Sequence, residues 1–109
     1  MRGATKGSQF VKVGSAADLK PGELAAFDAG GVRIAVANAN GQLFAIDELC
    51  THEQCSLAAD GTLEGTVVTC GCHGAQFDVT TGQVLAPPAP APLKTYPVHV
   101  EQGEIVVEV

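Results

Sequence analysis

The chain has few aromatic and few basic side chains. It has no tryptophan and only one tyrosine, and its twelve acidic residues outnumber its six lysine and arginine residues, which gives a formal net charge of −6. Stacking of bases or sugars on aromatic rings is therefore poorly supported, and no block of basic residues offers a surface for phosphate groups. These shortages argue against nucleic acid and anionic membranes as partners.

Long apolar runs are also missing. No segment of the 109 residues approaches the roughly 20 apolar residues that a membrane-spanning helix requires. The first nine residues are polar and lack the apolar stretch of a secretory signal, so we expect a cytoplasmic protein. A chain of this length is expected to form one domain, residues 1–109, which is small enough to benefit from a metal centre.

A helical period of apolar residues is lacking as well, and the pattern is typical of short β-strands separated by turns. Gly30-Gly31, Asn40-Gly41 and Gln102-Gly103 indicate tight turns between segments rich in Val, Ile and Ala. Strands are expected over residues 9–13, 23–28, 32–38, 42–47, 66–69, 76–79, 94–100 and 104–109. The sequence therefore predicts an all-β fold.

The composition changes between residues 47 and 86, where glycines and cysteines become frequent and the expected strands shorten. We interpret residues 47–86 as a small inserted lobe on a β base formed by residues 9–46 and 87–109. The proline-rich segment 87–92 leads back to the base. It is interpreted either as a stiff extended linker or as a cover that keeps water away from the lobe.

Two thiols and two imidazoles come from two short segments of this lobe. Cys50 and His52 form C-x-H, and after a gap of 17 residues Cys70 and His73 form C-x-x-H. A [2Fe–2S] cluster with two cysteines on one iron and two histidines on the other requires this ligand set. Structural zinc usually takes its ligands from C-x₂₋₄-C and H-x₃₋₅-H pairs. The pattern favours the cluster, with a zinc site, a Cys–His nucleophile and a purely structural role as alternatives.

With this motif, the chain resembles the Rieske ferredoxin family from about residue 10 to residue 109. The resemblance includes Asp47 before the first ligand pair, Leu63-Glu64-Gly65 before the second and Phe77-Asp78 after it. Residues 93–98 are similar to the tail of ferredoxins that serve aromatic-ring dioxygenases. The resemblance implies a Rieske-like antiparallel β-sandwich base with an inserted cluster-binding lobe.

The resemblance also implies a role for each cysteine and histidine of the lobe. Cys50 and Cys70 would hold the inner iron, and His52 and His73 would hold the outer one. In the Rieske proteins of cytochrome bc complexes, cysteines at the places of Cys55 and Cys72 form a disulfide, whereas many oxygenase ferredoxins lack this pair. We expect a disulfide between Cys55 and Cys72. The alternative is that both are free, buried thiols.

The residues after the last ligand predict a low reduction potential. High-potential Rieske proteins continue with Gly-Ser-x-Tyr, whose two hydroxyls donate hydrogen bonds near the cluster, whereas this chain has Gly74-Ala75-Gln76-Phe77. A hydrogen bond to a charged group is worth about 1.5–3 kcal/mol, and about 59 mV corresponds to 1.4 kcal/mol for one electron. We therefore expect a potential of about −150 to +50 mV, in the lower half of the Rieske range.

The charges of the lobe also predict a low reduction potential. No lysine or arginine occurs between Arg33 and Lys94, whereas six carboxylates do. These are Asp47, Glu48, Glu53, Asp60, Glu64 and Asp78. Their negative charge disfavours a reduced, more negative cluster. They are interpreted either as a solvated surface or as an acidic docking face for basic patches on redox partners.

The function that the resemblance implies is that of a soluble one-electron carrier. It would take an electron from a flavoprotein reductase, pass it to a terminal oxygenase, and have no catalytic residues of its own. We expect a monomer. The alternative is a cluster-bearing small subunit of a larger oxidoreductase, nitrite-reductase-like or arsenite-oxidase-like. His99 matches no ligand position and is interpreted as an exposed strand residue.

Overall fold

The computed structural model describes residues 9–49, 56–71, 74–86 and 91–109. Within these residues the chain forms eleven strands, one 3-10 helix and one short α-helix. The strands are β1 (Phe10–Ser15), β2 (Leu24–Ala29), β3 (Val32–Ala39), β4 (Gln42–Asp47), β5 (Thr62–Glu64), β6 (Val67–Thr69), β7 (Gln76–Asp78), β8 (Val84–Ala86), β9 (Thr95–Tyr96), β10 (Val98–Glu101) and β11 (Glu104–Glu108). The helices are η1 (Ala16–Asp18) and α1 (Leu57–Asp60).

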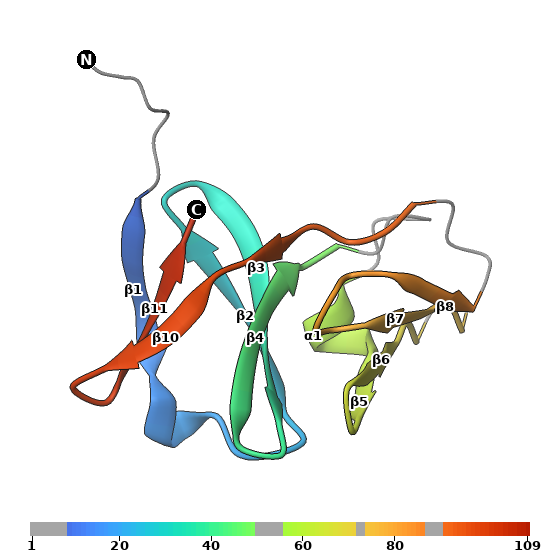
Figure 1. Cartoon of the computed structure of the whole chain (residues 1–109), viewed down its shortest axis with the longest axis horizontal. Helices are drawn as coiled ribbons and strands as arrows, with labels where there is room; N and C mark the ends of the chain where they lie inside the picture. The colour runs from blue at the N-terminus through green and yellow to red at the C-terminus, as the bar shows by residue number, and fades with distance from the viewer. Residues whose placement is uncertain (1–8, 50–55, 72–73, 87–90) are drawn as a thin grey trace.

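The strands are arranged in three antiparallel sheets, which confirms the predicted all-β fold. Their orders are β1-β11-β10, β2-β3-β4-β9 and β5-β6-β7-β8. The first two sheets lie together and are called the base below; the third sheet and α1 lie to one side of them and are called the lobe (Figure 1). The boundaries expected from the sequence, 9–46 with 87–109 for the base and 47–86 for the lobe, stay a prediction.

The three turns expected from the sequence are present. Each is a two-residue connection between antiparallel strands, and both of its residues have a positive φ. The φ values are 61° and 92° at Gly30-Gly31, 57° and 95° at Asn40-Gly41, and 51° and 79° at Gln102-Gly103. This is the backbone of type I′ turns, whose twist matches that of the flanking strands.

Strand β3 is buried on both faces. Ile34 and Val36 belong to the apolar core of the base, whereas Ala35 and Ala37 belong to a second core that includes Leu57 and other side chains of the lobe. A strand covered on both faces is apolar along its length instead of alternating with polar residues. The second core therefore fixes the lobe on the middle sheet of the base.

The segment predicted as one strand over residues 94–100 is divided at Pro97. Tyr96 in β9 pairs with Ala45 of the middle sheet, whereas Val98 in β10 pairs with Val107 of the first sheet. Proline has no N–H to contribute to a sheet and is found at strand ends and edges. The chain crosses from one sheet to the other at this residue.

The short elements of the lobe were not all expected. The strands β5 and β8 have three residues each and α1 has four, which is too short for a periodic pattern to show. The Oγ atom of Ser56 accepts a hydrogen bond of 3.1 Å from the N–H of Ala59 and so caps α1. No helix in the described part of the chain is long and apolar enough to cross a membrane.

Candidate metal centre

Of the four predicted ligands, the structure describes Cys70. Its side chain is 1% exposed and lies in the second core, together with Leu57, Ala75 and Phe77. It is a free cysteine. The predicted ligands Cys50, His52 and His73, and the cysteines Cys55 and Cys72 of the expected disulfide, lie outside the described residues.

Cys70 opens a tight turn between β6 and β7. Its N–H donates a hydrogen bond of 2.7 Å to the carbonyl of Ala75, and its own carbonyl accepts one of 2.8 Å from the N–H of Gly74. Gly74 has a φ of 78°, which favours glycine. These bonds fix the two ends of the segment that carries the second predicted ligand pair.

The segment that carries the first predicted ligand pair is also closed at its ends. Leu49, before it, forms an isolated antiparallel bridge with Ser56, after it. The N–H of Leu57 donates a hydrogen bond of 2.9 Å to the carbonyl of Glu48. The residues on both sides of 50–55 are therefore held together by backbone hydrogen bonding.

Glycine at position 71 allows the chain after Cys70 to lie against the end of α1. A Cβ atom at Gly71, next to Cys70, would lie 1.7 Å from the carbonyl oxygen of Asp60, at the end of α1. The start of the second ligand segment therefore lies in close contact with α1, the helix that follows the first ligand segment. Two segments whose ends are held by backbone hydrogen bonds, one of them beginning with a buried thiol, suit a centre whose Cys and His ligands come from both, so the residues present fit the [2Fe–2S] site that the motif predicts.

The two positions where high-potential Rieske proteins have hydroxyl groups are fully buried here. Ala75 and Phe77 are both 0% exposed and belong to the same core as Cys70. Neither side chain can donate a hydrogen bond. The environment on the Cys70 side of the site is therefore apolar.

Asp47, the last residue of β4, is hydrogen-bonded to the segment around Lys94, where the chain comes back from the lobe to the base. Its N–H donates to the carbonyl of Lys94 at 2.9 Å, and its Oδ2 accepts from the N–H of Lys94 at 3.0 Å. Its Oδ1 accepts a 2.7 Å hydrogen bond from the hydroxyl of Tyr96. Burial, this hydrogen bond and the charge of Asp47 raise the pKa of Tyr96 above its ordinary value. From the sequence, Asp47 was noted for the family resemblance and as one of the six carboxylates of the lobe, but not for its contact with Tyr96.

Replacing Tyr96 with phenylalanine tests this connection. A hydrogen bond to a charged group contributes about 1.5–3 kcal/mol, so we expect Tyr96→Phe to unfold at a lower temperature at neutral pH. Because the raised pKa belongs to the folded state, this stabilisation is present below about pH 10 and is lost as the pH rises further. Thermal unfolding from neutral pH upwards should show the two proteins converging above about pH 10. A constant difference would contradict the assignment.

The acidic residues of the lobe do not all form one exposed face, which corrects the prediction. Glu48 is 1% exposed, and its Oε1 lies 3.2 Å from Nη2 of Arg33. The Oδ1 of Asp78 accepts hydrogen bonds from the N–H and hydroxyl of Thr80. Sequence reasoning missed the burial of Glu48 because its partner is 15 residues away on β3. Glu53 lies outside the described residues.

His99 lies on the surface, as predicted. It is an exposed residue of β10, and its Nε2 is 3.2 Å from Oε2 of Glu101. Its ring packs edge-on against Phe10, with a centroid distance of 6.1 Å.

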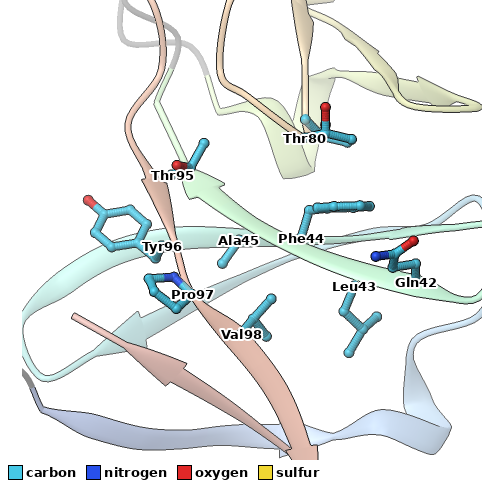
Figure 2. A pocket seen from close by; sticks show the side chains of 10 residues that line it. Gln42, Leu43, Phe44, Ala45, Thr80, Thr95, Tyr96, Pro97 and Val98 are labelled. Carbon is cyan, nitrogen blue, oxygen red and sulfur yellow. The ribbon is translucent and has the colours of Figure 1, made fainter.

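A cavity of about 380 Å³ lies between the base and the lobe. Figure 2 shows Thr80 on the lobe side of it, opposite strand residues of the base such as Phe44 and Thr95. Its lining residues are Gln42, Leu43, Phe44, Ala45, Val79, Thr80, Thr95, Tyr96, Pro97 and Val98. Cys70, the predicted ligand that the structure describes, is not among them.

Known proteins match most of this chain. The Rieske [2Fe-2S] domain family matches residues 9–97. The biphenyl dioxygenase ferredoxin subunit of Pseudomonas sp. (strain KKS102) is 37% identical over 99 residues, which are 91% of each chain. The structure of the Sphingomonas yanoikuyae B1 ferredoxin matches with a TM-score of 0.86 and 36% identity, over 93% of this chain and 99% of that one. A complex of reduced oxygenase and oxidised ferredoxin in carbazole 1,9a-dioxygenase matches with a TM-score of 0.83 and 36% identity, over 90% and 91% of the two chains.

Proposed function

The chain belongs to the Rieske [2Fe-2S] domain family, and we propose that it is the ferredoxin component of an aromatic-ring dioxygenase system. In this role it carries one electron at a time from a flavoprotein reductase to a terminal oxygenase and is not itself an enzyme. The observation that carries the proposal is the match of 91% of this chain to 91% of a dioxygenase ferredoxin subunit. A cytoplasmic location and a monomeric state stay predictions.

The residues proposed to hold the cluster are Cys50, His52, Cys70 and His73. The bound cluster supplies the site that gains and loses one electron. The burial of Cys70 keeps water from its sulfur, and backbone hydrogen bonds limit the movement of the residues at the ends of both segments when the charge of the site changes. Limited movement favours electron transfer because less of the surrounding protein has to rearrange.

The two histidines would control both the potential and its pH dependence. Two neutral imidazoles in place of two thiolates make the site less negative, so an electron is accepted at a higher potential than in an all-cysteine site. The N–H group of each imidazole ligand can release a proton at alkaline pH, and added negative charge on reduction opposes this release. The potential should therefore be constant near neutral pH and fall as the pH rises.

The combination Ala75→Ser with Phe77→Tyr should raise the potential. It supplies both hydroxyls found in high-potential Rieske proteins, and hydrogen bonds to a charged group of about 1.5–3 kcal/mol each favour the more negative, reduced state. We expect an increase of about 100 mV, since 59 mV corresponds to about 1.4 kcal/mol. Voltammetry at neutral pH measures it. Val79→Thr, which adds a hydroxyl elsewhere in the same core, is the control and should leave the potential unchanged. An unchanged potential in the double variant would show that the missing hydroxyls do not lower it.

The proposed function is tested by electron transfer between purified components. The chemically reduced protein is mixed with the terminal oxygenases of the biphenyl and carbazole systems, and its reoxidation is followed by absorbance. Faster reoxidation with an oxygenase than with buffer alone is expected, together with oxygenated product when a reductase and NADH are added. Absence of transfer to both oxygenases would contradict the proposal.

A further inference from the structure

Glu48 is a charged side chain in an almost fully buried position. It directly follows β4, two residues before Cys50, and only 1% of its side chain is exposed. It is the largest fully buried polar side chain in the described part of the chain. A buried charge is costly unless it is paired and hydrogen-bonded, so its partners show what its position requires.

The carboxylate of Glu48 joins three parts of the chain. Its Oε1 accepts a hydrogen bond of 3.2 Å from Nη2 of Arg33 on β3. Its Oε2 accepts one from the hydroxyl of Ser56, the residue that follows the first ligand segment and caps α1. Since its backbone carbonyl also accepts from Leu57, Glu48 connects the two ends of that segment to the base.

The two charges of this ion pair are in different environments. The side chain of Arg33 is 59% exposed, whereas that of Glu48 is 1% exposed. Water and salt screen an exposed charge much more than a buried one. The field that acts on the neighbouring ligand segment is therefore that of the carboxylate, and it is negative.

Stability alone does not account for the burial of this carboxylate. Taking a charge out of water is costly, and the exposed charge of Arg33 repays only part of that cost. A glutamine at position 48 would also keep an acceptor for the Ser56 hydroxyl. A further effect of the negative charge is therefore worth testing, and a redox centre held by Cys50, two residues along the chain, is a group on which it would act.

We propose that Glu48 is a positioning residue for the first ligand segment, and that its buried charge lowers the reduction potential of the cluster. The opposite charge of Arg33 would offset part of this effect. The inference rests on the proposed function, since it requires the cluster at Cys50. It goes beyond that function because it assigns part of the potential to one ion pair outside the ligand set.

The test compares the potentials of three variants with that of the loaded, unsubstituted protein. Glu48→Gln removes the charge and keeps the acceptor, so we expect about a tenfold increase in the equilibrium constant for reduction, which is about 59 mV. Arg33→Gln should shift the potential downward by less, because it removes an exposed charge. Glu64→Gln, an exposed carboxylate of β5, is the matched control and should shift the potential least.

A purely structural role would not produce shifts of opposite sign. High salt separates a buried charge from an exposed one: the shift in potential of Glu48→Gln should persist, whereas any shift of Glu64→Gln should disappear.

Release of iron to a chelator provides a second readout. Ser56→Ala should accelerate this release without an upward shift in potential. The proposal would be overturned if Glu48→Gln shifted the potential no more than Glu64→Gln, or if Glu48→Gln and Arg33→Gln shifted it in the same direction. Failure of the proposed function would instead appear in the unsubstituted protein, as a missing Rieske spectrum.

Discussion

Replacing His52 or His73 with cysteine is expected to lower the reduction potential by about 100 mV or more, because a thiolate adds a negative charge to the site. Each replacement also removes an imidazole N–H that can release a proton, so the alkaline pH dependence should be reduced as well. Voltammetry at a series of pH values on each variant that still binds iron and sulfide measures both effects.

His99 provides the matched control for these two replacements. It is exposed on β10 and makes its contacts with Glu101 and Phe10, away from the ligand segments in the sequence. His99→Cys should leave both the potential and its pH profile unchanged. If the pH profile stayed the same in His52→Cys and His73→Cys, the assignment of these histidines as ligands would be wrong.

Gly71→Ala is expected to abolish most cluster binding. The added Cβ would lie 1.7 Å from the carbonyl oxygen and 2.8 Å from the carbonyl carbon of Asp60. That backbone cannot move easily, since the N–H groups of Asp60 and Gly61 donate 2.9 Å hydrogen bonds to the carbonyls of Ser56 and Leu57 at the start of α1. Overpacking costs about 1–3 kcal/mol and occasionally more, and a collision with backbone is expected at the upper end of that range because it would push Cys70 and the end of α1 apart. Iron and acid-labile sulfide per chain, with the unfolding temperature, measure the loss.

Gly74→Ala is the control for this experiment, because it changes the same turn without a collision. Among the described residues, no atom beyond its chain neighbours lies within 4 Å of a Cβ added at Gly74, although its φ of 78° is unfavourable for alanine. The expected cost is about 1–2 kcal/mol, with cluster content largely kept. Full cluster content and unchanged stability in Gly71→Ala would show that the close approach of Gly71 to the end of α1 is not needed to hold the cluster.

Sequence reasoning predicted the features that depend on neighbouring residues. The turns at Gly30-Gly31, Asn40-Gly41 and Gln102-Gly103 follow from residues that tolerate a positive φ, and β4 begins and ends at the predicted residues. The short motif around Cys70 and His73 likewise indicates the metal chemistry, because the types of its ligands and their spacing are local properties of the chain.

Features that depend on distant residues were not predictable in this way. The burial of Glu48 requires Arg33 on another strand, and the role of Asp47 requires Tyr96, 49 residues further along the chain. Nothing in the local sequence shows that these side chains meet. The division of residues 94–100 at Pro97 also depends on the third dimension, because the chain there changes from one sheet to the other.

The most direct test of the central claim is voltammetry of the purified, cluster-loaded protein from neutral to alkaline pH. A histidine-ligated dioxygenase ferredoxin should give a one-electron wave at about −150 to +50 mV, constant near neutral pH and falling as the pH rises. A wave well above about +100 mV would contradict the low-potential assignment and favour a high-potential respiratory or oxidase-type partner. A potential that did not change at alkaline pH would contradict histidine ligation.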